Sequence, residues 1–221
     1  MGELPVSGRD TVHVWVSAAS TGRPEVTRRL LRRAGCALLR RADREVGVGH
    51  RPDGRPWVRA GAVSLPVSVS HAEGVVVVAA RRAGPVGVDV ERRRPLPALA
   101  LAHRWYAPPE AAWLGDLPDA TRVEAFLLLW TAKEAVGKAL GRGLRSGGLG
   151  RRMPVPDHPR ELLRPLPDEP GVRVGHPACG PGLVLAVAVG GGSRAAAHPG
   201  SGADPVRRAA LTGVEVSVRF E

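Results

Sequence analysis

One helix constrains this sequence more than any other feature, because it is apolar on nearly every face and still carries the only two lysines of the chain. Residues 125–132 read AFLLLWTA, a run without a polar face that is typical of a buried helix. Thr121 followed by Glu124 predicts a capping box at its start, and Gly141 predicts its end. The fold must therefore supply a core large enough to surround this helix.

Three charged residues, Lys133, Glu134 and Lys138, lie in the same helix. Charges in an apolar setting need partners, because an unpaired buried charge is strongly unfavourable. Glu134 and Lys138 are four residues apart and share a helix face, so an ordinary ion pair within the helix would explain them. The alternative is a site that needs a compact, rotatable ammonium group, since all other cationic residues among the 32 lysines and arginines are arginines.

Composition indicates a folded protein with an anionic partner. The 221 residues are 43% hydrophobic, which suits one large domain or two small ones. The net charge of +11 favours nucleic acid, phosphate-bearing small molecules or an acidic protein as partner. Cys36 and Cys179 are too far apart for a metal motif, which is typical of a reducing compartment. Residues 1–10 lack a signal-peptide core and the apolar run 75–80 is too short to span a bilayer, so we expect a cytoplasmic protein without a membrane partner.

The first half of the chain contains several features that could hold phosphate. A strand at 12–16 precedes a helix at 24–41, whose polar surface carries Arg28, Arg29 and Arg32 among other arginines. This surface is either a solvated face or a phosphate grip. A turn-rich loop at 50–58 holds Arg55 between Gly54 and Pro56, and a strand at 65–70 ends beside His71.

Two carboxylates follow in the strand 86–91, after the strand 75–80. Strand periodicity places Asp89 and Glu91 on one face. Glu134 would add a third carboxylate, and Mg²⁺ prefers such oxygen ligands together with substrate phosphates. A solvated strand edge neutralised by the arginines at 92–94 is the alternative.

The remainder of the chain predicts a second set of elements. We expect helices at 96–105 and from Pro108, short strands and loops within 145–180, a strand at 183–189, a linker at 190–204 and a closing strand at 212–220. The stretches 74–90 and 182–216 resemble one another weakly. We therefore expect a mixed α+β protein of two similar halves that face each other across a cleft, each half a helix packed on a small antiparallel sheet.

Five short motifs occur in a fixed order, and together they are more specific than any one of them. They are GRP at 54–56, SVSH at 68–71, VGVDVE at 86–91, WYAPPE at 105–110, and WTAKEA at 130–135 continuing through Lys138 to GRGL at 141–144. In this order they resemble the larger, single-chain class of 4′-phosphopantetheinyl transferases. Arginine stands at position 55 where the family often has lysine, and the segment between the first strand and the basic helix is short for the family.

The resemblance implies two halves related by pseudo-twofold symmetry. We place the N-terminal half, with the coenzyme A phosphate contacts and the Asp-x-Glu pair, at 1–97. The C-terminal half, with the Lys-Glu helix and the closing strands, is placed at 98–221. The implied reaction moves the 4′-phosphopantetheine arm of coenzyme A onto a serine of an apo acyl or peptidyl carrier protein, giving the holo carrier and 3′,5′-ADP.

The resemblance also implies roles for individual residues. Glu134, or a metal-bound water, would be the base and Lys138 would stabilise the leaving group. Mg²⁺ would be held by Asp89, Glu91 and Glu134, and coenzyme A, the substrate, would be held by Arg55, Ser70, His71 and Lys133, with Arg28, Arg29 and Arg32 as further candidates.

An acidic carrier protein would account for the basic charge, and two halves in one chain would make a monomer sufficient. A basic nucleic-acid-binding protein is the main alternative, but 4% aromatic residues provide few stacking surfaces and it leaves the carboxylates unexplained, so nucleic acid is not the expected partner. A Mg²⁺-dependent phosphohydrolase is a further alternative, which would need no acceptor protein.

Overall fold

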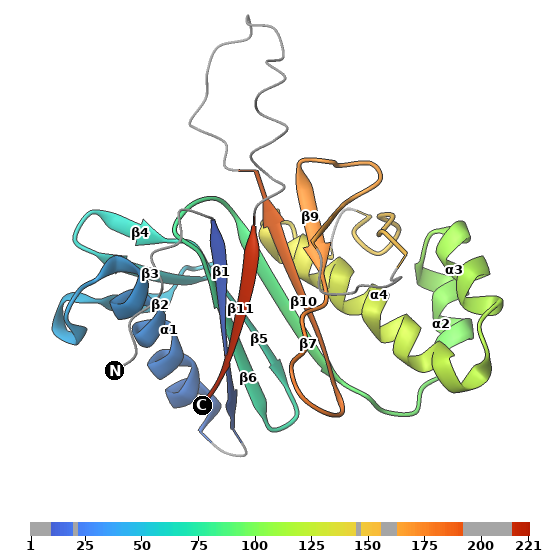
Figure 1. Ribbon diagram of the computed structural model, residues 1–221, viewed down its shortest axis with the longest axis horizontal. Helices are drawn as coiled ribbons and strands as arrows, with labels where there is room; N and C mark the ends of the chain where they lie inside the picture. The colour runs from blue at the N-terminus through green and yellow to red at the C-terminus, as the bar shows by residue number, and fades with distance from the viewer. Residues whose placement is uncertain (1–9, 20–21, 145–146, 156–162, 192–213) are drawn as a thin grey trace, which may run out of the picture.

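The computed structural model describes residues 10–19, 22–144, 147–155, 163–191 and 214–221 (Figure 1). In chain order the elements are β1 (Thr11–Ala18), α1 (Arg23–Leu39), the 3-10 turn η1 (Asp43–Glu45), β2 (Gly47–His50), β3 (Pro56–Ala60), β4 (Val63–Leu65), β5 (Val67–Ala72), β6 (Val75–Ala80), β7 (Val86–Arg92), α2 (Ala98–Trp105), α3 (Pro108–Gly115), α4 (Asp119–Ala139), β8 (Arg164–Pro165), β9 (Val172–Gly175), β10 (Leu183–Gly190) and β11 (Glu215–Phe220).

Three sheets form from these strands. The first has the order β11-β1-β6-β5, in which β11 is parallel to β1 and the other pairs are antiparallel. The second is antiparallel with the order β7-β10-β9-β8. A small antiparallel sheet, β2-β3-β4, lies beside α1. The predicted α+β class, with helices on small antiparallel sheets, is confirmed.

The layers follow from strand alternation. Val76 and Val78 of β6 face a core shared with α1 and the small sheet, whereas Val75 and Val77 face a central core. The same central core receives Val88 of β7 and Leu185 and Val187 of β10, which lie on one face of the second sheet. The opposite face of that sheet packs on α4. Because both faces of β6 are covered, its sequence is a continuous apolar run without alternation.

A polar seam joins the two sheets. Strands β5 and β7 lie side by side and run in the same direction, but they are not paired by backbone hydrogen bonds as neighbours in a sheet are. Serine hydroxyl groups of β5 bind backbone amides of β7 instead. Ser68 Oγ accepts a hydrogen bond from the amide of Val88 at 3.1 Å, and Ser70 Oγ accepts one from the amide of Val90 at 3.4 Å. The seam is therefore held by hydroxyl groups at the centre of an otherwise apolar layer.

Two local predictions are wrong in detail. The strand predicted at 65–70 is two strands, because Pro66 lacks an amide hydrogen and separates β4 in the small sheet from β5 in the first sheet. Helix α4 begins at Asp119, so Thr121 lies within its first turn and donates to the carbonyl of Pro118. Glu124 pairs with Arg93 at 2.8 Å, and the predicted capping box does not form.

The two predicted halves exchange strands. Strand β7 precedes the boundary predicted at 97/98 but pairs with β10 in the second sheet. Strand β11 follows that boundary but pairs with β1 in the first sheet. The pseudo-twofold relation and the boundary itself stay predictions, and most of the linker predicted at 190–204 lies outside the described residues.

Candidate active site

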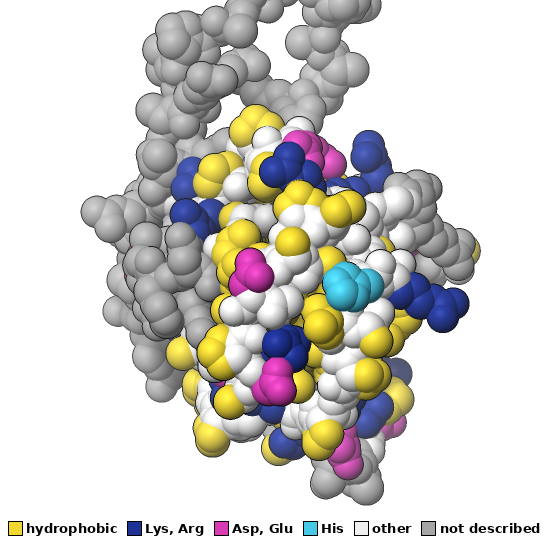
Figure 2. Space-filling view, turned by 90° about the vertical axis from the view of Figure 1, so that its right-hand side faces the viewer, with side chains coloured by type: hydrophobic (Ala, Val, Ile, Leu, Met, Phe, Trp, Pro, Cys, Tyr) yellow, Lys and Arg dark blue, Asp and Glu magenta, His cyan; other side chains and the backbone are white. Residues whose placement is uncertain are grey.

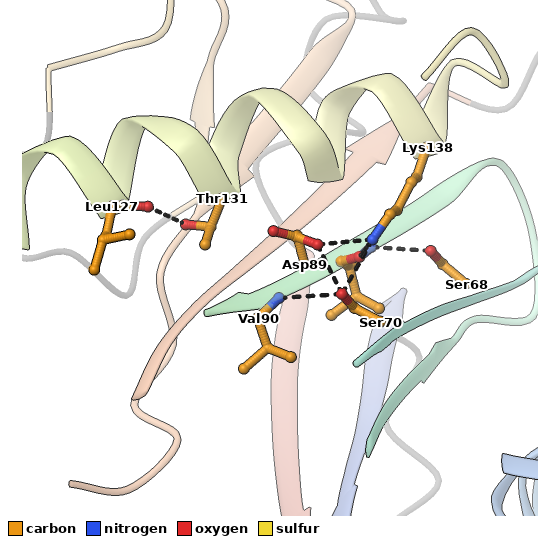
Figure 3. Close-up of polar contacts among 8 residues, drawn as sticks. Ser68, Ser70, Asp89, Val90, Leu127, Thr131 and Lys138 are labelled. Carbon is orange, nitrogen blue, oxygen red and sulfur yellow. Dashed lines mark hydrogen bonds and ion pairs between the residues drawn. The ribbon is translucent and has the colours of Figure 1, made fainter. Parts of the chain in front are cut away.

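The centre of the site is an ammonium group shared by both sheets (Figure 3). Lys138 Nζ lies 2.7 Å from Asp89 Oδ1, 3.1 Å from Ser70 Oγ and 3.0 Å from the carbonyl oxygen of Val88. Ser70 Oγ is also 2.7 Å from Asp89 Oδ1 and donates its hydrogen there. The site thus forms where α4 crosses the seam between β5 and β7.

Glycine allows α4 to approach the seam this closely. A Cβ on Gly87 would lie 1.9 Å from the carbonyl oxygen of Ala135, so helix and strand touch through their backbones. A Cβ on Gly137 would lie 2.3 Å from the carbonyl oxygen of Gly143, which turns back under the end of the helix. This close packing brings Lys138 within reach of β7.

Three carboxylates face the same region, as the strand period predicts. Burial raises the pKa of Asp89, and Glu91 adds to this, while Lys138 and Ser70 oppose it. Burial also raises the pKa of Glu134, reinforced by Asp89 and Glu91. Among the described residues, the Glu134 carboxylate makes no hydrogen bond or ion pair. The site therefore gathers negative charge without fully neutralising it.

The three carboxylates provide oxygen atoms, the donor type that a hard divalent cation prefers. Glu134 has no hydrogen-bond or ion-pair partner in the described part of the chain. Burial raises the pKa of its carboxyl, Asp89 and Glu91 add to this, and a cation would relieve the repulsion among the carboxylates. Asp89 and Glu91 are instead paired with Lys138 and Arg94, both at 2.7 Å. As they stand, no three acidic, histidine or cysteine side chains among the described residues form a ready metal cluster.

His71 lies at the same end of β5. Its Nε2 is 3.0 Å from Thr27 Oγ1, and the Thr27 hydroxyl donates to the carbonyl of Arg23 at 2.8 Å. The Thr27 oxygen can then only accept, which assigns the hydrogen to His71 Nε2. Burial, followed by the charges of Arg23 and Lys138, lowers the pKa of His71. An anion bound here would favour the charged ring.

A cleft of about 1340 Å³ begins at Lys138 and runs between the β2–β3 loop and the end of α4. Arg51, Arg55 and Arg142 line it together with Asp53, which pairs with Arg55 at 2.5 Å, so its walls carry a net positive charge. A Cβ on Gly141 would lie 2.8 Å from Arg55 Nη1, which places the guanidinium directly over Gly141. The cleft has room for an extended anionic molecule, and it reaches the carboxylates through Lys138, which binds Asp89.

Lys133 lies apart from this cluster. Its side chain is 0% exposed, and its Nζ contacts Glu110 Oε2 at 2.7 Å, the carbonyl oxygen of Arg151 at 2.5 Å and the ring face of Tyr106 at 4.7 Å. These contacts join α4 to α3 and to the segment after α4. Its predicted contact with coenzyme A stays a prediction, and the burial of Lys133 speaks against it.

The arginines predicted on α1 do not line the cleft. Arg28 is exposed, and Arg32 pairs with Asp43 at 3.1 Å. Arg29 donates to Ser17 Oγ at 3.1 Å. Their contact with a phosphate group stays a prediction.

The lysines do not form the ordinary helix ion pair that the sequence left open, since each binds a carboxylate of another element. Sequence reasoning missed Glu110, Ser68 and Thr27 as partners. Glu110 sits in the WYAPPE motif, where it also accepts the amides of Ala107 and Met153, so the motif itself could have pointed to it.

Carboxylates and one lysine thus meet at the seam beside a cationic cleft. This arrangement is typical of an enzyme that acts on phosphoryl groups. Residues 85–165 match the family model of the 4′-phosphopantetheinyl transferase superfamily. The match supports the superfamily resemblance seen in the motifs within this region, and the assignment to the larger, single-chain class stays a prediction.

Several similar proteins carry names of the same superfamily. HetI of Nostoc sp., a 4′-phosphopantetheinyl transferase, is 36% identical over 81 residues, which are 36% of this chain and 34% of HetI. The 4′-phosphopantetheinyl transferase gsp of Aneurinibacillus migulanus is 32% identical over 91 residues, 41% of this chain and 36% of the relative. Protein slr0495 of Synechocystis sp. is 38% identical over 102 residues, covering 46% and 40% of the two chains. The matches thus span only 34–40% of the length of these relatives.

Proposed function

We propose that this protein transfers the 4′-phosphopantetheine arm of coenzyme A to a serine of an apo acyl or peptidyl carrier protein, giving the holo carrier and 3′,5′-ADP. The observation that carries the proposal is the meeting of Asp89, Glu134 and Lys138 at one end of the cationic cleft. The superfamily match covers all three residues. Neither the nucleic-acid alternative nor a hydrolase is favoured by the relatives.

The proposed step is an in-line displacement at the phosphorus next to pantetheine. The carrier serine oxygen forms the new P–O bond, and the bond to 3′,5′-ADP breaks with its electron pair remaining on the leaving phosphate. Glu134 accepts the serine proton, a role supported by its raised pKa and its lack of another partner among the described residues. Positioning and charge stabilisation supply most of the acceleration in such reactions.

Cationic and hydrogen-bonding groups would hold the substrate. Lys138, which lies 2.7 Å from Asp89, and His71, which follows Ser70 in β5, would bind the diphosphate, while Arg55 in the cleft would bind a further phosphate group. Ser70 gives its hydroxyl hydrogen to Asp89, so we propose that it orients that carboxylate and contacts coenzyme A only secondarily.

Asp89, Glu91 and Glu134 would hold Mg²⁺, for which they offer oxygen ligands on one face of the site. When bound, the metal would offset negative charge on the diphosphate. Burial is the main cause of the raised pKa values of Asp89 and Glu134, and the neighbouring carboxylates add to both, so a cation that offsets this charge supports the assignment.

An acidic carrier protein suits the net charge of +11. Figure 2 views the molecule from the side of α2 and α3, where hydrophobic side chains are interspersed with single charges of both signs. The arginine excess is thus not gathered on this face. Because the net charge would attract an acidic carrier, we propose that carrier binding weakens as salt concentration rises. No helix in the described ranges is long and apolar enough to cross a membrane. Separate free cysteines support a cytoplasmic location, and both sheets within one chain support a monomer.

Intact-mass spectrometry tests the proposal directly. An apo carrier protein is incubated with this protein, coenzyme A and Mg²⁺, and the expected result is a gain of one phosphopantetheine mass. The gain should disappear on chelation and with Glu134→Gln. If several carrier types gain no mass and coenzyme A does not bind, the proposed function is wrong.

A further inference from the structure

We propose that Lys138 is a counter-ion of Asp89 and that its charge opposes divalent-cation binding at the carboxylates, although the proposed reaction uses both Lys138 and the cation. The inference rests on the proposed function only for the cation ligands, Asp89, Glu91 and Glu134. Its consequence is that removing the charge of Lys138 strengthens cation binding while it abolishes transfer.

Hydrogen-bond capacity is the first argument. A lysine ammonium carries three hydrogens. In the structure, Lys138 Nζ has three acceptors, namely Asp89 Oδ1, Ser70 Oγ and the carbonyl oxygen of Val88 (Figure 3). No hydrogen is left for a substrate phosphate. To bind substrate, the ammonium must therefore give up one of these contacts.

Burial is the second argument. The Asp89 side chain is 8% exposed, compared with 24% for Glu91, and Lys138 is its cationic partner. Glu91 has a separate cation in Arg94, while Glu134 has none within the described residues. Lys138 thus neutralises the carboxylate that water screens least.

Charge balance gives the sign of the effect. Three ionised carboxylates face two cations, Lys138 and Arg94, so the cluster keeps an excess of one negative charge, which attracts a divalent cation. A second cation near Asp89 must nevertheless enter against the repulsion of the ammonium, and at these separations in a partly buried site that repulsion is substantial. Without the ammonium, the carboxylates attract the cation more strongly.

The first test measures Mn²⁺ binding to the metal-stripped full chain by calorimetry, without coenzyme A or carrier. Lys138→Met removes charge and donors, whereas Lys138→Gln keeps donors without charge. Both should bind Mn²⁺ at least about fivefold more tightly than the wild type, the lower end of typical coupling between two sites. Arg142→Gln removes a cleft cation that has no contact with Asp89 in the described structure, and its affinity should change far less.

The second test uses the wild-type protein and does not depend on a variant folding. Because the chain has only two lysines, labelling lysine with ¹³C and ¹⁵N gives two side-chain signals. Lys133 lies over the Tyr106 ring, whose ring current identifies its signal. Titration with Mg²⁺ should shift the Lys138 signal and leave the Lys133 signal in place.

Either of two results would overturn the inference. One is equal or weaker Mn²⁺ affinity in both folded Lys138 variants, which would make Lys138 a residue that prepares Asp89 for the cation. The other is a Lys138 signal that stays fixed while Mg²⁺ saturates the protein. Both can occur while the wild type still modifies a carrier, so failure of this inference is distinct from failure of the proposed function.

Discussion

At the scale of single residues, the site concentrates groups whose charges are unfavourable in the folded, metal-free protein. Burial raises the pKa values of Asp89 and Glu134; Glu91 adds to both, and Asp89 adds to that of Glu134. A group whose folded pKa exceeds its unfolded value contributes stability below the unfolded pKa and loses it as pH rises through the folded pKa. The ionised carboxylates therefore reduce stability at neutral pH.

Glu134→Gln should consequently stabilise the metal-free protein. At pH 7 we expect an increase in Tm of about 2–4 °C, the shift that about 1 kcal/mol produces in a domain of this size. The increase should vanish below pH 4.5, the ordinary pKa of the group, where Glu134 is protonated in both states. Differential scanning calorimetry across pH measures it. Glu73→Gln, at an exposed position, is the control and should leave Tm unchanged. A lower Tm for Glu134→Gln at pH 7 would contradict the argument.

The sequence predicts shared faces better than contacts between elements. Strand and helix periods place Asp89 with Glu91 and Glu134 with Lys138, since both periods fix which side chains share a face, while the roles of these residues stay predictions. The pairing of Lys133 with Glu110 could not be predicted, because it depends on how α3 packs against α4. Short-range patterns carry no information about that packing.

At the scale of elements, the contact between α4 and β7 fixes the height of Lys138 above the seam. Gly87→Ala places a Cβ 1.9 Å from the carbonyl oxygen of Ala135, and neither backbone can yield without moving the helix. We expect a loss of at least about 2 kcal/mol in the free energy of unfolding, within the range for overpacked cores. Urea denaturation measures it. Gly171→Ala, where a Cβ meets nothing within 4 Å, is the matched control. Equal stability of the two variants would mean that α4 does not lie this close.

The Lys133–Glu110 pair ties α4 to α3, and its side chains are 0% and 4% exposed. Lys133→Met leaves the Glu110 carboxylate buried without its cation, for which we expect a loss of about 3–5 kcal/mol. The double variant Lys133→Met/Glu110→Gln removes both charges and should recover part of that loss. A double-mutant cycle measured by chemical denaturation gives the coupling. Additive losses would show that the pair does not act as a unit. If Lys133→Met raised the KM for coenzyme A without a loss of stability, direct binding of coenzyme A by Lys133 would be favoured.

Element boundaries were predictable where one local signal dominates. The apolar runs of β6 and α4 and the proline start of α3 appear in the structure close to their predicted positions. The split at Pro66 was missed because the alternating pattern continues across it, whereas the two strands pair with different sheets.

At the scale of the whole molecule, the chain is interwoven in a way that no local pattern encodes. Each half of the sequence gives one strand to the sheet of the other half: β7 pairs with β10, and β11 pairs with β1. Strand pairing between distant segments depends on the complete core, so sequence periods predicted the strands without predicting their neighbours. The interweaving places the seam, and with it the site, at the centre of the molecule.

Interweaving predicts how the chain responds to division. A fragment of residues 98–221 lacks β7, so β10 loses a neighbour and the core under α4 loses one wall. A fragment of residues 86–221 keeps β7 and with it the whole second sheet. We therefore expect the longer fragment to retain helical circular dichroism and a cooperative thermal transition, and the shorter one to lose both. The twelve extra residues decide the outcome because they supply β7, a complete edge strand of the second sheet, and the backbone contact through Gly87. A cooperative transition in fragment 98–221 would show instead that the halves fold independently and that β7 is dispensable for the second sheet.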